Sequence, residues 1–489
     1  MDVVVTPNLF AYIALILWYP IAIVLFRRYR PTIAVTLTAV GGVLLLPELV
    51  TLFDLPALPA FDKNVVVTTS ILLGCLLSPS RRIIFSMKKR MMFVVMAVIV
   101  VSAMGTALTN GDTLAYGAVT IQGMSINDGI SLSIRDFIFV VIPFFFTRAF
   151  VRSSRDVKDV YMVVVGAALI YSLLAIVEMW MSPQMHNWVY GFIQHSFIQT
   201  RRSGGGWRPM VFMGHGLALA VFFVGALLFA ASLSKLKVKV FNVGSRLWTG
   251  YLAVVLVMCK SMGALIYGVV CLPVVLLFKG RASVWVAVIL CAIAISFPWS
   301  RAAGVFPTEQ IVAQLASINQ ERAASLAFRF DNEDDLLEKA QERFLFGWGI
   351  YGRPWIYTEY GRTESITDGW WIIQYGTRGI FGFLFYFTLL IYPVVLVFRR
   401  WKRIEKEPEK IMIGTLSLVV ALRVVELLPN GLFSFLPFFF SGALAGIANA
   451  LSSKHAEPPK RAAVEPKPIH NVVEGGVRRP KHRQRSPLE

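Results

Sequence analysis

The feature that most constrains this chain is a series of long apolar runs, each bounded by charged or polar residues. A helix that crosses a bilayer needs roughly 17–25 mostly apolar residues, and 56% of the chain is hydrophobic while only 16% is charged. We therefore predict an all-α polytopic membrane protein with about 12–13 transmembrane helices, whose ends are uncertain by about 2–4 residues. The predicted spans are Leu9–Phe26, Pro31–Phe53, Asn64–Ser78, Met91–Leu108, Leu132–Phe150, Val160–Trp180, Val211–Leu233, Leu247–Cys259, Met262–Phe278, Val284–Trp299, Ile380–Phe398, Ile411–Leu428 and Gly431–Leu451.

Lysine and arginine predict the orientation, because cytoplasmic loops carry an excess of both. With these spans, the main basic clusters fall on one side, at Arg27, Arg81–Arg90, Arg152, Lys235, Lys279 and Arg399. That side is then the cytoplasm, the N-terminus is periplasmic and the C-terminus is cytoplasmic. The assignment requires two helices joined by a turn at Lys260–Ser261, since one fused helix would put the later basic clusters outside.

The chain divides into a transmembrane domain, residues 1–451, and a basic tail, residues 452–489. The domain includes two outer loops, residues 181–210 and 300–378. The tail is rich in Pro, Lys and Arg, so we expect it to be disordered, cytoplasmic and close to anionic lipid. The net charge of +19 is explained in the same way, without nucleic acid. The sequence contains no motif for a metal or a cofactor, and we expect neither.

The second outer loop is long enough to need a fold of its own. Its stretch "DNEDDLLEKAQERFLFGWG" predicts a surface helix that begins after Asn332 as N-cap, since acidic residues fill its first turn and Gly347 follows its end. Arg343 is expected on the exposed face of this helix.

The outer loops also bring arginines together with aromatic residues. Each arginine alone is well explained as a solvated or ion-paired surface residue. As a set they suggest a ligand, because guanidinium groups bind phosphate in a bidentate manner and flat aromatic faces suit sugar rings. A lipid-linked sugar phosphate at the outer leaflet would need both.

Three stretches carry a resemblance to a known family. "RRSGGGWRPMVFMGHGLALAVFF" resembles the Arg-Gly segment that leads into a helix in bacterial O-antigen ligases and Wzy-type polysaccharide polymerases. "FRFDNEDDLLEKAQERFLFGWGIYG" resembles their large periplasmic loop, and "TDGWWIIQYGTRGIFGFLFY" resembles the helix that follows it. The ligases usually place a histidine where this loop re-enters the membrane. Here Asp368 stands there, which favours a polymerase.

The resemblance implies a GT-C-like glycosyltransferase in the bacterial inner membrane that needs no metal or nucleotide. It would polymerise undecaprenyl-diphosphate-linked oligosaccharide repeat units into surface polysaccharide. Its partners would be that donor, a glycan acceptor, membrane lipids and other polysaccharide assembly proteins, but no nucleic acid. One alternative is an O-antigen ligase that transfers finished glycan to lipid A core. A second is a transporter or flippase for lipid-linked glycan.

Candidate site residues follow from the resemblance and from the chemistry of the donor. A leaving diphosphate needs cations in a partly dry site, and the acceptor hydroxyl needs a base. Asp368 is the first candidate for the base and His215 the second. Asp368 fits a helix N-cap equally well, and His215 fits a histidine that is hydrogen-bonded to a neighbouring helix of the bundle.

Arg423 and Glu426 lie three residues apart and suggest a structural pair. The diphosphate candidates are Arg208 and Arg329, then Arg202, Arg378 and Arg135, and the sugar-stacking candidates are Trp207, Trp355, Trp370 and Trp371.

Overall fold

The computed structural model describes residues 6–55, 58–86, 90–196, 200–201, 205–366, 368–431 and 434–451. The predicted tail and Arg202 lie outside these residues. Met1–Ser452 form one compact unit, and the structure below is that of this unit.

Most of the described residues are helical. The helices are α1 Leu9–Arg28, α2 Pro31–Leu45, α3 Lys63–Leu76, α4 Arg81–Ser86, α5 Arg90–Leu108, α6 Ile126–Asp136, η1 Phe137–Val141, α7 Ile142–Phe150, α8 Ser154–Met181, α9 Met185–Tyr190, α11 Gly216–Lys235, α12 Ser245–Met258, α13 Met262–Leu277, α14 Gly280–Ala302, α15 Thr308–Ile318, α16 Gln320–Glu342, α17 Trp370–Arg400, η2 Trp401–Arg403, α18 Glu407–Glu426 and α19 Leu436–Ala450. Two short hairpins complete the fold, β1 Leu114–Tyr116 with β2 Val119–Ile121 and β3 Lys239–Val240 with β4 Val243–Gly244.

The prediction of an all-α polytopic membrane protein is confirmed. Among the described residues, 7 helices are long and apolar enough to cross a membrane, and five shorter apolar helices accompany them. Each of the thirteen predicted spans corresponds to a helical segment. Helix α18 is not counted among these twelve, and it carries charged residues at both ends.

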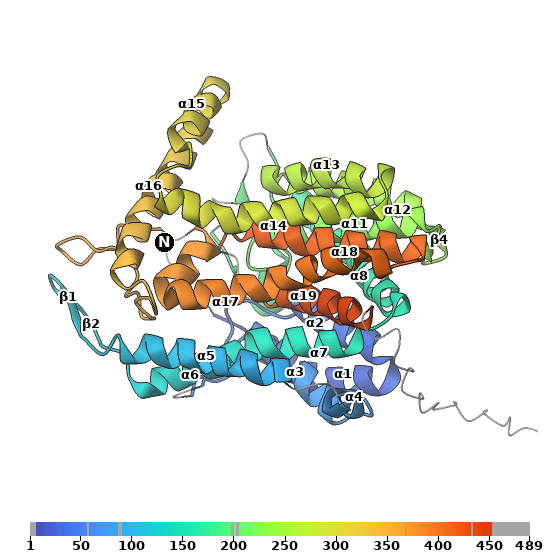
Figure 1. Ribbon diagram of the computed structural model, residues 1–489, viewed down its shortest axis with the longest axis horizontal. Helices are drawn as coiled ribbons and strands as arrows, with labels where there is room; N and C mark the ends of the chain where they lie inside the picture. The colour runs from blue at the N-terminus through green and yellow to red at the C-terminus, as the bar shows by residue number, and fades with distance from the viewer. Residues whose placement is uncertain are drawn as a thin grey trace, which may run out of the picture. The chain divides into compact units, whose positions relative to one another are not determined.

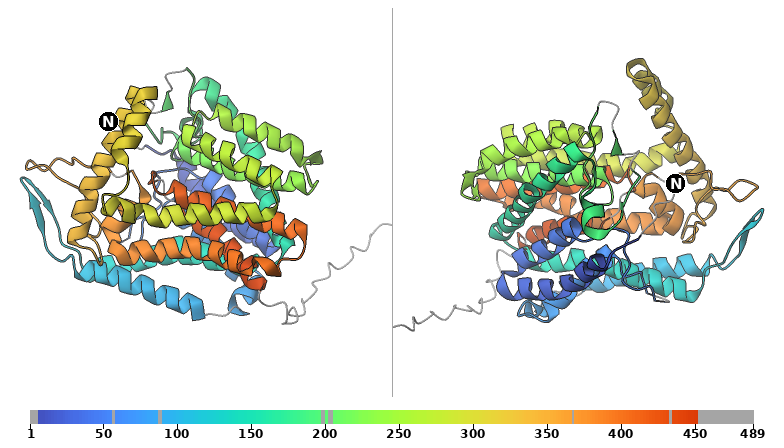
Figure 2. Two further views of the ribbon diagram at one scale, coloured as in Figure 1. Left: turned by 45° about the horizontal axis from the view of Figure 1, so that its top comes forward. Right: turned by 180° about the vertical axis from the view of Figure 1, so that it is seen from behind.

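The long helices lie side by side across Figure 1, where α14 packs on α18, α7 on α19 and α1 on α3. Hairpin β1–β2 and helices α15 and α16 project from one end, as both views of Figure 2 show. We call this the loop end, and it also carries residues 46–55, 58–62, 427–431 and 434–435. The opposite end, which we call the basic end, carries the arginines and lysines that close α1, α11 and α17.

Several predicted helix ends are wrong at the loop end, because the chain leaves the helix early to build this surface. Helix α2 ends at Leu45 and not at Phe53, since Pro47 disfavours a helical residue before it. Helix α11 begins at Gly216 and not at Val211, whose φ is 56°. Helix α19 begins at Leu436 and not at Gly431.

Of two further predictions, the turn at Lys260–Ser261 is confirmed and the helix start at Asn332 is wrong. The turn between α12 and α13 is confirmed, with Lys260 at φ 51°. The predicted N-cap at Asn332 is wrong, because α16 already begins at Gln320 and Asn319 caps it by accepting the Arg322 N–H at 2.9 Å. Asn332 is instead buried inside this helix, and its Oδ1 accepts the Ile366 N–H at 3.0 Å.

Two helices are irregular at one level of the bundle. Helices α6 and α7 are joined by the π-helical segment η1, which follows Asp136 directly. Helix α17 is broken at Gly379, where φ is 62° and ψ is −166°, a conformation that favours glycine. Such π-helical and broken segments frequently mark functional sites, and here each follows a charged residue, Asp136 or Arg378.

Candidate functional site

Two of the cavities near the loop end are lined by several charged side chains. The first, which we call the Glu48 cavity, has a volume of about 290 Å³ and is lined by Glu48, Lys63, His215 and Arg423 among others. The second, the Arg135 cavity, has a volume of about 220 Å³ and is lined by Arg135, Asp136, Trp370, Arg378 and Tyr386 among others. Gly431 lines both, so the segment after α18 is a wall that the two cavities share.

A partly buried ion pair organises one side of the Glu48 cavity. Lys63 Nζ donates to Glu48 Oε1 at 2.9 Å and to the Phe212 carbonyl at 2.9 Å. The same Glu48 oxygen accepts the Gly214 N–H at 3.1 Å. This carboxylate therefore ties the loop after α2, the start of α3 and the segment before α11 to one another.

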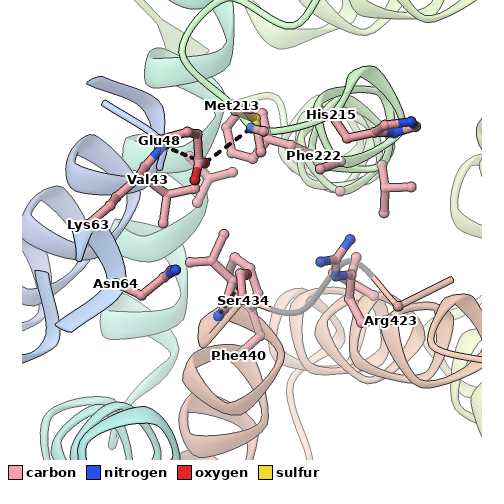
Figure 3. Close-up of a pocket in the computed structure, with 18 of the residues that line it drawn as sticks. Val43, Glu48, Lys63, Asn64, Met213, His215, Phe222, Arg423, Ser434 and Phe440 are labelled. Atoms are coloured by element: carbon pink, nitrogen blue, oxygen red, sulfur yellow. Dashed lines mark hydrogen bonds and ion pairs between the residues drawn. The ribbon is translucent and has the colours of Figure 1, made fainter. Parts of the chain in front are cut away.

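The opposite side of the Glu48 cavity is cationic. In Figure 3, Arg423 faces the Glu48–Lys63 pair across the open space, and His215 lies on the same side as Arg423. The predicted pairing of Arg423 with Glu426 is confirmed, at 3.5 Å between Nη1 and Oε2. Arg423 thus forms a structural ion pair and also lines the Glu48 cavity.

His215 is the N-cap of α11. Its Nδ1 accepts the Leu217 N–H at 3.0 Å. A neutral imidazole has one donor and one acceptor nitrogen, so this cap makes Nε2 the donor in the neutral ring. His215 in this arrangement has no free lone pair with which to accept a proton from a substrate, which favours Asp368 over His215 as base.

The Arg135 cavity brings two of the predicted arginines together. Arg378 is buried, and its Nη2 donates to Asp136 Oδ2 at 2.6 Å. The Arg135 guanidinium lies 5.7 Å from the centre of the Phe139 ring, and among the described residues no ion pair joins Arg135 to a carboxylate. Two guanidinium groups and one carboxylate give this cavity a surplus of positive charge.

Arg329 and Asp368, also predicted site residues, form an ion pair. Arg329 Nε lies 3.2 Å from Asp368 Oδ2, and both side chains are partly exposed. Asp368 does not cap α17, because the N-cap is Gly369 and no side chain caps it, so the alternative role as N-cap is wrong. A side chain added at Gly431 would come within 3.0 Å of the Asp368 carbonyl, which places the backbone of Asp368 beside the wall between the two cavities.

Glu333 is a buried carboxyl group close to the Arg329–Asp368 pair. It accepts a hydrogen bond from Trp371 Nε1 at 3.3 Å, and Arg301 Nε lies 3.7 Å from its Oε2. Burial raises the pKa of the Glu333 carboxyl to about 7, although the Arg301 charge opposes the shift. A carboxyl group with a pKa near neutrality is a further candidate for proton transfer at the loop end, beside Asp368 and His215.

The raised pKa of Glu333 predicts how stability depends on pH. A carboxyl group whose folded pKa lies near 7, above its ordinary value of 4.5, stabilises the folded state below pH 4.5 and loses that contribution as pH rises to about 7. We expect Glu333→Gln, which mimics the protonated group, to flatten the fall in Tm over this interval. Thermal unfolding between pH 4 and pH 9 measures it, with the exposed Glu338→Gln as control. An unchanged pH profile in Glu333→Gln would contradict the assignment.

Two other arginines of the second outer loop are structural. Arg353 is fully buried, and its Nη1 donates to the Asp112 carbonyl at 2.8 Å. Arg343 donates to the Thr109 carbonyl at 2.6 Å and reaches Asp112 Oδ2 at 2.7 Å. The prediction that Arg343 lies on an exposed helix face is therefore wrong, because the strand-bearing loop after α5 folds back onto the end of α16.

The four candidate tryptophans divide by exposure. Trp371 is 1% exposed and packs edge-on against Phe297, and Trp370 is 3% exposed among aromatic rings. Trp371 therefore offers a sugar little surface in this conformation, although it lines a further cavity of about 410 Å³ together with Trp299 and Tyr375. Trp370 offers the Arg135 cavity only a small part of its surface. Trp355 is 43% exposed, and Trp207 is half-buried in a β-bridge to Arg201. The latter two still present surface to a ligand.

Arg208 lies where the first outer loop meets α11. Its backbone N–H donates to the Thr200 carbonyl at 2.9 Å, and its Nη2 lies 3.5 Å from the Lys260 carbonyl. Any side chain at Gly216 would collide with the Arg208 methylenes, so glycine allows this arginine to lie across the start of the helix. Arg208 is thus held near His215, while Arg202 lies outside the described residues.

Sequence reasoning missed the acidic partners of these cations. Glu48 and Asp136 both fell inside predicted spans, where a charge signals a cavity or an ion pair, and that signal could have identified them. Lys63 stands just before a predicted span, a position that gives no such signal.

The sequence matches no protein-family model, and a comparison with curated proteins finds no significant match. Within the described ranges, no group of three or more His, Cys, Asp or Glu side chains is arranged to hold a metal ion. The function must therefore be argued from the geometry of the two cavities.

Proposed function

We propose that this multi-pass membrane protein is a glycosyltransferase that polymerises undecaprenyl-diphosphate-linked oligosaccharide at the periplasmic face of the bacterial inner membrane. The observation that carries the proposal is the Arg135 cavity. It combines the surplus cation Arg135 with the buried Arg378–Asp136 pair, at the level where two helices are irregular. A cationic cavity at the end of an apolar bundle suits a ligand with an anionic head and an apolar tail.

The proposed reaction uses these residues as binding groups and as a base. The acceptor hydroxyl forms the new bond to the anomeric carbon of the donor sugar and gives its proton to Asp368. The bond between that carbon and the phosphate oxygen breaks, and its electron pair leaves with the diphosphate. Arg135 and Arg329 stabilise the added negative charge. The interaction with Arg135 counts for more than it would in water, because Arg135 lines a partly dry cavity, whereas Arg329 is partly exposed.

Two alternative functions share the same cavities. A ligase differs only in the acceptor, which would be lipid A core. A flippase is favoured by one specific observation: transporters use broken helices around buried polar sites, and α17 is broken at Gly379 beside the buried Arg378.

One reconstitution separates the three functions. The purified protein is placed in liposomes with undecaprenyl-diphosphate-linked oligosaccharide, and the products are separated by size. A polymerase gives a ladder of repeat units on the lipid carrier. A ligase gives no longer product until lipid A core is added, and a flippase moves the donor across the bilayer without making a glycosidic bond; either result would contradict the polymerase proposal.

The periplasmic location of the loop end is a prediction that cysteine labelling can test. The four native cysteines are buried, so an introduced cysteine should dominate the signal. In intact spheroplasts, we expect a membrane-impermeant maleimide to label Ile318→Cys, which is 82% exposed at the loop end. Arg281→Cys at the basic end should react only after the membrane is opened. The reverse pattern would place the two cavities on the cytoplasmic side.

A further inference from the structure

A large apolar groove separates α5 from α17 on the outside of the bundle. Its volume is about 810 Å³, and its walls include Met91, Val94 and Val98 of α5 and Ile380, Leu384 and Phe385 of α17. Val94 is 57% exposed and Leu384 is 46% exposed, so in a membrane these walls face lipid. The groove is distinct from the two cavities of the candidate site.

The groove is closed by cations toward the basic end. Arg90 at the start of α5 and Arg148 near the end of α7 line it there, together with Tyr392 of α17. Arg148 is half-buried, its guanidinium lies 5.6 Å from the centre of the Phe145 ring, and within the described part of the chain neither arginine forms an ion pair with a carboxylate. An arginine that is partly withdrawn from water without a carboxylate leaves its donors available to an anion from outside the protein.

We propose that this groove binds an anionic phospholipid of the leaflet at the basic end. The phosphate lies between Arg148 and Arg90, and an acyl chain lies along α5 and α17. Charge selects the occupant, since guanidinium donors match phosphate oxygens, and basic pockets between helices on the cytoplasmic side bind anionic head groups.

The length of the groove agrees with this occupant. Helix α17 runs from Ile380 to Tyr392 along it, which is roughly 18 Å at 1.5 Å per residue. Half of the hydrocarbon core measures about 15 Å, the depth that one acyl chain fills. The site does not depend on the proposed glycosyl transfer.

The bound lipid would stabilise the packing of α5 against the irregular part of α17. At the other end of α5, Thr106 Oγ1 donates to the Phe346 carbonyl at 2.8 Å, and the Phe346 ring stacks on Phe381. Phe381 also lines the groove. A lipid in the groove therefore touches the same segment that follows the break at Gly379.

Native mass spectrometry of the full chain in mild detergent tests the proposal. Phosphatidylglycerol is titrated in parallel with the phosphatidylcholine that has the same acyl chains. We expect wild type to retain phosphatidylglycerol preferentially, and Arg148→Gln to weaken that binding by roughly tenfold, the effect of losing one charge-assisted contact. Arg281→Gln, an exposed arginine of α14 at the same end, should bind as wild type does.

A second variant keeps the test decisive if Arg148→Gln does not fold. Leu384→Trp fills the groove without changing a charge, and it should reduce retention of phosphatidylglycerol while Arg281→Gln does not. Equal retention of the two lipids by wild type would overturn the proposal. So would displacement of phosphatidylglycerol by undecaprenyl diphosphate to the same extent in wild type and in Arg148→Gln, because the groove would then hold the isoprenoid chain of a donor.

Discussion

Asp136→Asn should lower the free energy of unfolding by about 3–5 kcal/mol, the usual cost of removing one partner of a buried ion pair. Arg378 is buried within α17 and donates to Asp136 at 2.6 Å. Without the carboxylate, its charge remains in a site that offers little other compensation. Equilibrium unfolding in a fixed detergent measures the loss.

A double variant separates the effect of the Asp136–Arg378 pair on stability from its effect on donor binding. The double variant Asp136→Asn, Arg378→Gln has no buried charge left at this position, so it should recover part of the lost stability. If Arg378 takes part in binding the diphosphate, the double variant still binds the donor poorly. Glu407→Gln removes the exposed Lys410–Glu407 pair and should change the stability very little, because solvent screens an exposed pair. Equal losses in Asp136→Asn and Glu407→Gln would contradict a buried pair at Asp136.

The fold could be predicted from the sequence because each transmembrane helix can be recognised from its own run of apolar residues. An apolar run such as Met91–Leu108 has no other stable conformation in a bilayer, since every backbone N–H and C=O must be paired within the segment. The helix ends could not be predicted so well. At α2, α11 and α19 they depend on a surface assembled from separate loops, as when Glu48 pairs with Lys63 and with the backbone of Gly214.

Individual residues of the candidate site could be predicted from the sequence, but their ion-pair partners could not. Arg135 and Arg378 were both selected, yet the partner of Arg378 is Asp136, 242 residues away in the sequence. Arg343 was assigned to an exposed helix face because its partner Asp112 lies 231 residues away. A helical pattern shows which residues share a face, but it does not show which distant segment covers that face.

The pairing of Arg329 with Asp368 changes what the arginine can do before a substrate binds. The guanidinium is occupied by the carboxylate at 3.2 Å, so a phosphate would have to compete for it. Displacement of the carboxylate by the donor would free Asp368 at the moment when the acceptor needs a base. In the proposed reaction, this exchange would link binding of the donor to activation of the acceptor within one pair of side chains.

Asp368→Asn should lower turnover by about 10²–10⁴-fold, the range typical for loss of a general base. An amide keeps the size of the side chain but cannot take up the proton of the acceptor hydroxyl. Because Asp368 does not cap α17, folding should be unaffected. Elongation of lipid-linked oligosaccharide by the purified variant measures turnover, and thermal unfolding measures folding. Glu364→Gln, an exposed acid of the same loop, should elongate at the wild-type rate.

His215→Asn decides between Asp368 and His215 as the base. Asparagine is a good N-cap, so it replaces the bond from His215 to the Leu217 N–H while removing the imidazole. We expect this variant to keep most of its activity, because Nδ1 is engaged in the cap and Nε2 is then a donor in the neutral ring. Wild-type turnover in Asp368→Asn together with collapse in His215→Asn would move the base to the Glu48 cavity. The diphosphate would then have to lie near Lys63 and Arg423, the other cations of that cavity.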